Sequence, residues 1–150
     1  MRVAGTEDDP VNGVFVQQMN KLFELDFLEI QFPDNFHPRF GPVVDFRLTE
    51  HLRDMPGPGT VPLLYPIHFS NSSTNWPIEG MKKPNAIERN ADTEKWLYPN
   101  GYYCVVRRFS SKEEKRRIVA SVVEPGAFGD VPVLGFENHL NLFHEHKCGL

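Results

Sequence analysis

The chain has 150 residues, of which 40% are apolar and 24% charged, and its net charge is −4. A chain of this length is expected to form one domain and to bury roughly 68–70% of its unfolded surface. Thirteen Pro and eleven Gly exclude a bundle of long helices, because a Pro inside a helix costs ~3 kcal/mol. The two cysteines, Cys104 and Cys148, exclude a disulfide scaffold. No apolar stretch approaches the ~20 residues that a membrane span needs, and the acidic start lacks a signal-peptide pattern, so we expect a cytoplasmic protein without a membrane partner.

The first half of the chain carries helix and loop signals. Apolar residues at spacings of three and four predict an amphipathic helix over Val11–Ile30. Val43–Leu48 alternates weakly and predicts a short strand, in which Arg47 would pair with Asp45 or Glu50. Val61–Phe69 is apolar, but its prolines predict an edge strand or an extended segment. Polar and Pro-rich loops follow, and Ala86–Trp96 is compatible with a short helix.

The second half carries strand signals. Aromatic and β-branched residues predict strands over Tyr102–Phe109 and Arg116–Glu124. Ser110 with Glu113 would also make a capping box and begin a helix, but the β-branched run favours two antiparallel strands joined by a charged loop. Val131–Phe136 and His139–Phe143 predict further short strands. The expected fold class is α+β, a β-rich single domain with an N-terminal helix and long Pro/Gly-rich loops.

Charge is distributed unevenly along the chain. Residues 1–34 have a net charge of −5, residues 35–150 a net charge of +1, and Gly101–Val123 a net charge of +4. The balance of the whole chain argues against a polyanionic partner, whereas the local excess of bases permits one.

Several separated segments, in the right order, resemble adenine-specific DNA methyltransferases of restriction-modification systems. The segments are RRFSSKEEKRRIVAS (Arg107–Ser121), GFENHLNLFH (Gly135–His144), VVDFRLTEHLR (Val43–Arg53), GTVPLLYPIHF (Gly59–Phe69), NWP (Asn75–Pro77) and KKPNAI (Lys82–Ile87). The resemblance covers roughly residues 41–150 and lies downstream of that family's catalytic domain. It implies a division into an acidic segment over 1–40 and a recognition-type domain over 41–150, with a C-terminus that looks truncated at Gly149-Leu150.

The motifs that such enzymes use for chemistry are missing from the sequence. They bind S-adenosylmethionine through a glycine-containing turn after a strand, and they hold adenine with an Asn/Asp-Pro-Pro-aromatic motif. The chain has no Pro-Pro, and Asn75-Trp76-Pro77 has the wrong order. The resemblance therefore implies a DNA-binding target-recognition fragment, inactive alone and without a cofactor of its own, that positions duplex DNA for a catalytic domain elsewhere.

Three groups of residues are candidate DNA contacts, because forked guanidinium groups, ammonium groups, hydroxyls and amides suit phosphates and base edges. They are Arg107, Arg108, Ser110, Ser111, Lys112, Lys115, Arg116 and Arg117; Lys82, Lys83 and Asn85; and Asn138, His139 and Asn141.

The sequence also leaves other functions open. Zinc could be bound by His139 and His144, or by His144, His146 and Cys148, although neither spacing fits a defined motif. Cys104 with His139 could form a hydrolase pair, although Cys104 is expected to be buried and inert. The acidic N-terminal segment could instead make the chain a protein-interaction module, a subunit of a split methyltransferase that does not touch DNA, or a homo-oligomer.

Overall fold

The computed structural model describes residues 36–70, 73–109, 113 and 119–145. Within these residues the chain forms short strands and 3-10 turns and no α-helix. The strands are β1 (Phe36–Phe40), β2 (Leu52–Arg53), β3 (Thr60–Leu64), β4 (Phe69–Ser70), β5 (Ser73–Thr74), β6 (Ala86–Glu88), β7 (Leu97–Pro99), β8 (Tyr103–Arg107), β9 (Ala120–Val123), β10 (Val133–Phe136) and β11 (Leu140–Glu145). The 3-10 turns are η2 (Asp45–Arg47), η3 (Thr49–His51), η4 (Pro66–His68), η5 (Glu94–Trp96) and η6 (Pro125–Phe128). The β-rich class is confirmed, and the helix predicted over Val11–Ile30 lies outside the described residues.

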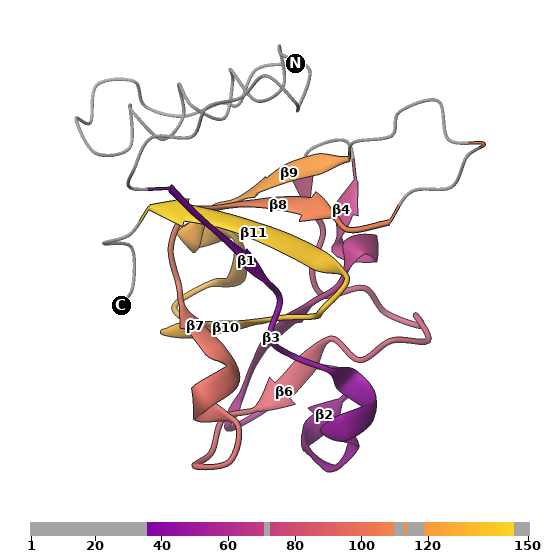
Figure 1. Cartoon of the computed structure of the whole chain (residues 1–150). Coiled ribbons are helices and arrows are strands. Elements are labelled where there is room, and N and C mark those ends of the chain that lie inside the picture. The colour runs from indigo at the N-terminus through magenta and orange to yellow at the C-terminus, as the bar shows by residue number, and fades with distance from the viewer. Residues whose placement is uncertain (1–35, 71–72, 110–112, 114–118, 146–150) are drawn as a thin grey trace.

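Four strands form an antiparallel sheet in the order β1-β11-β8-β9 (Figure 1). The predicted antiparallel pair in the second half is confirmed where it is described, with β8 and β9 in register from Tyr103 opposite Val123 to Val106 opposite Ala120. The predicted strand at His139–Phe143 is also confirmed as β11, which pairs with β8 on one side and β1 on the other.

The second sheet has five strands in the order β2-β6-β3-β10-β7. Its β3 and β10 strands are parallel, and its other pairs are antiparallel. β10 confirms the strand predicted at Val131–Phe136. Because β10 and β11 are joined by the short turn at Glu137–His139 but belong to different sheets, this turn connects the two sheets.

The expectation of an edge strand at Val61–Phe69 is wrong, because β3 lies between β6 and β10. The backbone N–H of Leu63 donates to the Asn85 carbonyl in the β6 direction (2.9 Å), so the nitrogen of Pro62 faces the β10 side. Pairing with β10 begins only at Leu63, opposite Gly135. The N–H that proline lacks is therefore not needed at this position.

The predicted strand at Val43–Leu48 is also wrong. Only Val43 makes a bridge, to Glu137, and η2 follows. The Asp45 carboxylate accepts the backbone N–H of Phe46 (2.7 Å), a local bond that favours a turn over a strand. Asp45 forms an ion pair with Lys83 at 2.7 Å, in place of the pairing that was expected with Arg47.

The predicted helix at Ala86–Trp96 is replaced by strand β6 and a turn. The Asn90 carboxamide oxygen accepts the backbone N–H groups of Asp92 (2.9 Å) and Thr93 (3.1 Å), which is an Asx turn. The Thr93 hydroxyl donates to the Glu88 carbonyl at 2.6 Å. These bonds satisfy the backbone locally and stop a helix from forming.

The two sheets share one core. Its largest cluster takes Leu64, Leu134 and Phe136 from the five-stranded sheet, and Tyr103, Val105, Val123, Leu140 and Leu142 from the four-stranded sheet. The rings of Tyr103 and Phe136 meet at a centroid distance of 5.0 Å. This packing fixes the ends of β8 and β11 relative to the turn that carries the candidate site. Over the described part of the chain, no helix has the length and apolarity that a membrane crossing requires.

Candidate nucleic-acid interface

Two of the predicted contact groups meet where β8 ends. In the β8–β11 ladder Arg107 lies opposite Leu140, and the backbone N–H of Arg108 donates to the His139 carbonyl at 2.8 Å. The Arg108 guanidinium reaches the Asn138 carbonyl at 3.5 Å. Arg107 and Arg108 are exposed. The fold therefore gathers residues some thirty positions apart in sequence at one end of the four-stranded sheet.

Arg108 lies between two exposed aromatic rings that sequence reasoning did not select. Its guanidinium carbon is 4.9 Å from the centroid of Phe40 and 5.2 Å from that of Phe109. The Phe109 ring also meets the His139 ring edge to face at 5.9 Å. Phe40 and Phe109 remain 63% and 61% exposed. We call the four residues Phe40, Arg108, Phe109 and His139 the Arg108 platform.

The Arg108 platform has a rigid support. Glu137 is 1% exposed, and its carboxylate accepts hydrogen bonds from the backbone N–H and the ring Nδ1 of His139. The backbone N–H of Glu137 in turn donates to the Leu64 carbonyl at 2.9 Å. A buried carboxylate held in this way fixes the orientation of the His139 ring at the surface.

A glycine brings Phe40 to the platform. A Cβ on Gly41 would lie 2.1 Å from the Glu137 carbonyl oxygen, closer than any side chain permits. The Gly41 N–H donates to the Leu140 carbonyl at 2.9 Å. The close approach of these backbones sets the end of β1, and with it Phe40, beside the β10–β11 turn.

Asn138 and Asn141 have different environments. Asn138 is half-buried in the β10–β11 turn, and its backbone N–H donates to the Val43 carbonyl at 3.0 Å. Asn141 lies within the sheet, opposite Phe40 on one side and Val106 on the other. Its carboxamide oxygen is buried and has no hydrogen-bond partner. Asn138 is thus part of the surface next to the Arg108 platform, whereas Asn141 is part of the sheet behind it.

The loop that carries Lys82 and Lys83 packs against η2. Lys83 forms the ion pair with Asp45 and lies 5.4 Å from the centroid of the Tyr65 ring. The pKa of Asp45 is lowered overall. Partial burial alone would raise it, but the hydrogen bond and the charge of Lys83, together with the hydrogen bond from the Phe46 N–H, outweigh burial. Burial, followed by the charge of Asp45, raises the pKa of Tyr65, which donates to that carboxylate at 3.4 Å. Lys82 is exposed.

The prediction that Asn85 pairs with an adenine conflicts with its position, since Asn85 is 1% exposed. Its carboxamide oxygen accepts the Ile78 N–H at 2.8 Å and lies 3.0 Å from Nε2 of His68. Its nitrogen donates to the carbonyls of Asp54 and Ile78, each at 2.8 Å. Asn85 joins three loops and has no polar atom to spare for a base.

The basic loop between β8 and β9 lies mostly outside the described residues. The predicted contacts that fall there are Ser110, Ser111, Lys112, Lys115, Arg116 and Arg117.

The described residues give no support to the two enzymatic alternatives. Cys104 is fully buried in the middle of β8, and burial raises the pKa of its thiol to about 12, which excludes a nucleophilic thiolate. Over the described ranges no three His, Cys, Asp or Glu side chains cluster as metal ligands would. The zinc candidates His146 and Cys148 fall outside those ranges, as does the side chain of His144.

An exposed arginine between aromatic rings on a rigid sheet end is typical of a surface that binds another macromolecule. The chain is similar to a part of Type II methyltransferases. It is 62% identical to the Type II methyltransferase M.BsuBI of Bacillus subtilis over 116 residues. This matched stretch makes up 77% of this chain and 23% of that protein. It is 46% identical over 104 residues to the Type II methyltransferase M.PstI of Providencia stuartii, which covers 69% of this chain and 20% of that protein. These matches confirm that the chain resembles part of a restriction-modification methyltransferase.

The chain spans only about a fifth of the length of the curated relatives that it matches. No family model and no solved structure matches it.

Proposed function

We propose that this chain is a target-recognition portion of an adenine-specific DNA methyltransferase and that it binds duplex DNA. The observation that carries the proposal is the Arg108 platform, an exposed cation between exposed aromatic rings, in a chain that is 62% identical to part of a Type II methyltransferase. In this proposal the surface holds the duplex, and a catalytic domain outside this chain modifies it.

The chemistry of the platform suits a nucleic acid. Arg108 provides a forked donor for a phosphate or a guanine edge. Phe40 and Phe109 hold the guanidinium in place by cation–π contacts, each worth about 0.5–1 kcal/mol at an exposed site. His139, oriented by Glu137, and Asn138 add polar groups that can face base edges. Because few basic side chains are available to neutralise phosphates, we expect weak duplex binding that falls steeply with salt concentration.

The sequence lacks the motifs with which the resembled enzymes bind S-adenosylmethionine. The pocket lined by Pro66, Arg107 and Ser121 has a volume of about 40 Å³, too small for a ligand whose sites measure roughly 300–1,000 Å³. We therefore derive no methyl-transfer step from this chain and assign the cofactor to the catalytic domain.

The test is fluorescence anisotropy with a labelled duplex at several salt concentrations. We expect binding at low salt, and we expect Arg108→Ala to reduce the slope of log affinity against log salt by about 1, as the loss of one phosphate contact would. Arg89→Ala is the matched control, since Arg89 is also exposed but pairs with Glu94 (2.9 Å) beyond β6. An absence of duplex binding at low salt, or equal losses in the two variants, would refute the proposal.

A second function rests on the same surface. Exposed aromatic and arginine side chains are also the residues that dominate protein–protein contacts. A catalytic subunit of a split enzyme could therefore cover Phe40 and Phe109 in place of DNA. Size-exclusion chromatography of the chain with and without an oligonucleotide separates the two, because only DNA binding shifts the elution of the mixture.

A further inference from the structure

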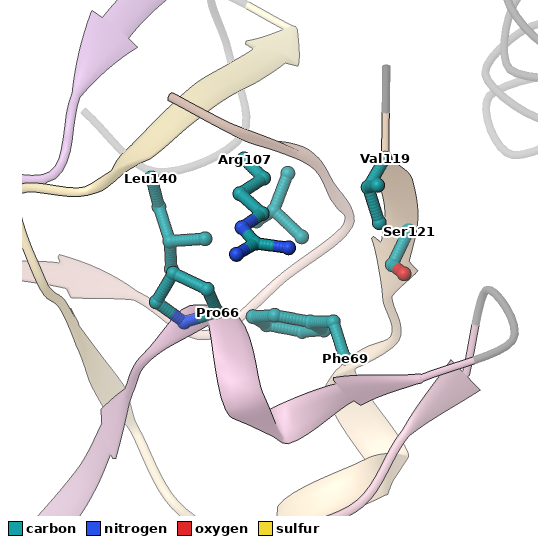
Figure 2. A pocket seen from close by; sticks show the side chains of 7 residues that line it. Pro66, Phe69, Arg107, Val119, Ser121 and Leu140 are labelled. Atoms are coloured by element: carbon teal, nitrogen blue, oxygen red, sulfur yellow. The ribbon is translucent and has the colours of Figure 1, made fainter. Parts of the chain in front are cut away.

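A small pocket lies between η4 and the ends of β8 and β9, on the face of the four-stranded sheet that carries Arg107 and Leu140. Pro66, Phe69 and Leu140 form apolar walls, and Arg107 and Ser121 are the two polar residues that line it (Figure 2). Its volume of about 40 Å³ exceeds the 10–15 Å³ that one water needs and is well below the ~150 Å³ cavity that holds a benzene ring. The pocket therefore has room for a small polar group but not for a nucleobase.

Two hydrogen-bond donors, Arg107 and Ser121, line this pocket. In Figure 2 the guanidinium of Arg107 extends toward the space between Pro66 and Phe69. Ser121 is 1% exposed, and its hydroxyl has no hydrogen-bond partner. A buried hydroxyl without a partner costs about 1–3 kcal/mol, so native structures rarely keep one without a use for it. The described lining contains no acidic side chain that would repel an anion.

We infer that this pocket binds one phosphodiester group of the nucleic acid, with an oxygen accepting from the Ser121 hydroxyl and the charge facing Arg107. The inference rests on the proposed function and assigns Arg107 to the phosphate backbone and not to a base edge. Apolar walls favour it, because a charge-assisted hydrogen bond strengthens where water is excluded. The setting favours a nucleic acid over an acidic peptide, since Arg107 is followed by Arg108 and lies in the stretch Gly101–Val123 with a net charge of +4.

The first test compares Ser121→Ala and Arg107→Ala in duplex titrations at several salt concentrations. Ser121→Ala removes a hydroxyl that makes no hydrogen bond in the free protein, so we expect thermal stability equal to or above that of the parent. We expect it to weaken duplex binding about fivefold without changing the salt slope, because no charge is lost. Arg107→Ala should reduce the slope by about 1. Duplex binding of Ser121→Ala equal to that of the parent would overturn the inference.

The second test needs no duplex and therefore separates this inference from the proposed function. Dimethyl phosphate, a minimal phosphodiester, is titrated into the labelled chain while the amide NMR signals of Arg107 and Ser121 are recorded, with acetate as the matched carboxylate. We expect dimethyl phosphate to shift both signals and Ser121→Ala to abolish the response. Shifts of this kind in a chain that binds no duplex would support the site and refute the proposed function. Equal responses to acetate, or none to dimethyl phosphate while the duplex binds, would overturn the inference.

Discussion

Replacing Asn85 by alanine should destabilise the fold strongly. The Asn85 carboxamide makes four hydrogen bonds to nitrogen and oxygen atoms, two as acceptor with Ile78 and His68 and two as donor to the carbonyls of Asp54 and Ile78. Its nitrogen also donates to the Met55 sulfur at 3.6 Å. Truncation leaves two donors and two carbonyls without this partner, and each unsatisfied buried group costs about 1–3 kcal/mol. Because the carbonyls keep a second lone pair and the loops can relax, we expect a loss of about 3–5 kcal/mol.

A loss of this size lowers the melting temperature by about 10 °C, since 1 kcal/mol corresponds to about 2–4 °C in a chain of this size. Urea unfolding followed by Trp fluorescence measures it directly. Lys82→Ala is the control from the same loop, and its exposed side chain predicts a change within about 0.5 kcal/mol. If Asn85→Ala unfolds within 1 kcal/mol of the parent but loses duplex affinity, Asn85 is a DNA contact and our structural interpretation is wrong.

Three further predictions concern other buried groups. Burial lowers the pKa of His68 below its ordinary value of 6.5, so the unfolded state binds the proton more readily. The free energy of unfolding should therefore hold above pH 6.5 and fall as the pH drops below it, which urea midpoints measured from pH 8 to 5 would show; a flat profile would contradict this. The raised pKa of Cys104, about 12, predicts that a variant with no other thiol does not react with a disulfide reagent at pH 8 until it is unfolded; rapid labelling of the native protein would show that the thiol is accessible. Gly41→Ala should lower the free energy of unfolding in urea by about 1–3 kcal/mol, because its Cβ would lie 2.1 Å from the Glu137 carbonyl oxygen. The control Gly57→Ala should be neutral, because nothing lies within 4 Å of its Cβ, and equal effects of the two variants would show that the close approach at Gly41 does not matter.

Local sequence patterns predicted the second half of the fold better than the first. Both β8 and β9 are rich in residues that favour strands, and they are consecutive along the chain, so the sequence alone predicts their antiparallel pairing. The segment Ala86–Trp96 failed because side-chain bonds from Asn90 and Thr93 to nearby backbone compete with helix formation, and a composition-based prediction does not weigh them. Pro62 misled for a different reason, because only the register shows that its nitrogen faces β10 at a position before the pairing with that strand begins.

The candidate site was predicted only in part. Arg107, Arg108, Asn138 and His139 were selected from residue type and from the family resemblance, but their proximity depends on the β8–β11 register. Phe40 could not be found, because its place beside Arg108 depends on the contact between Gly41 and the Glu137 backbone, which joins distant parts of the chain. Asn85 was selected as a DNA contact because it follows Lys82 and Lys83 in a polar loop. The structure shows instead that its side chain is buried and joins neighbouring loops.

The central claim is that the Arg108 platform contacts duplex DNA. The most direct measurement is an NMR titration of the labelled chain with a short duplex at low salt, in which each amide shift is assigned to its residue. We expect the largest shifts at Phe40, Arg108, Phe109 and His139, and small ones at the ion pair of Arg89 and Glu94. Shifts that fall on the Arg89 side and spare the platform, or no shifts at all, would contradict it.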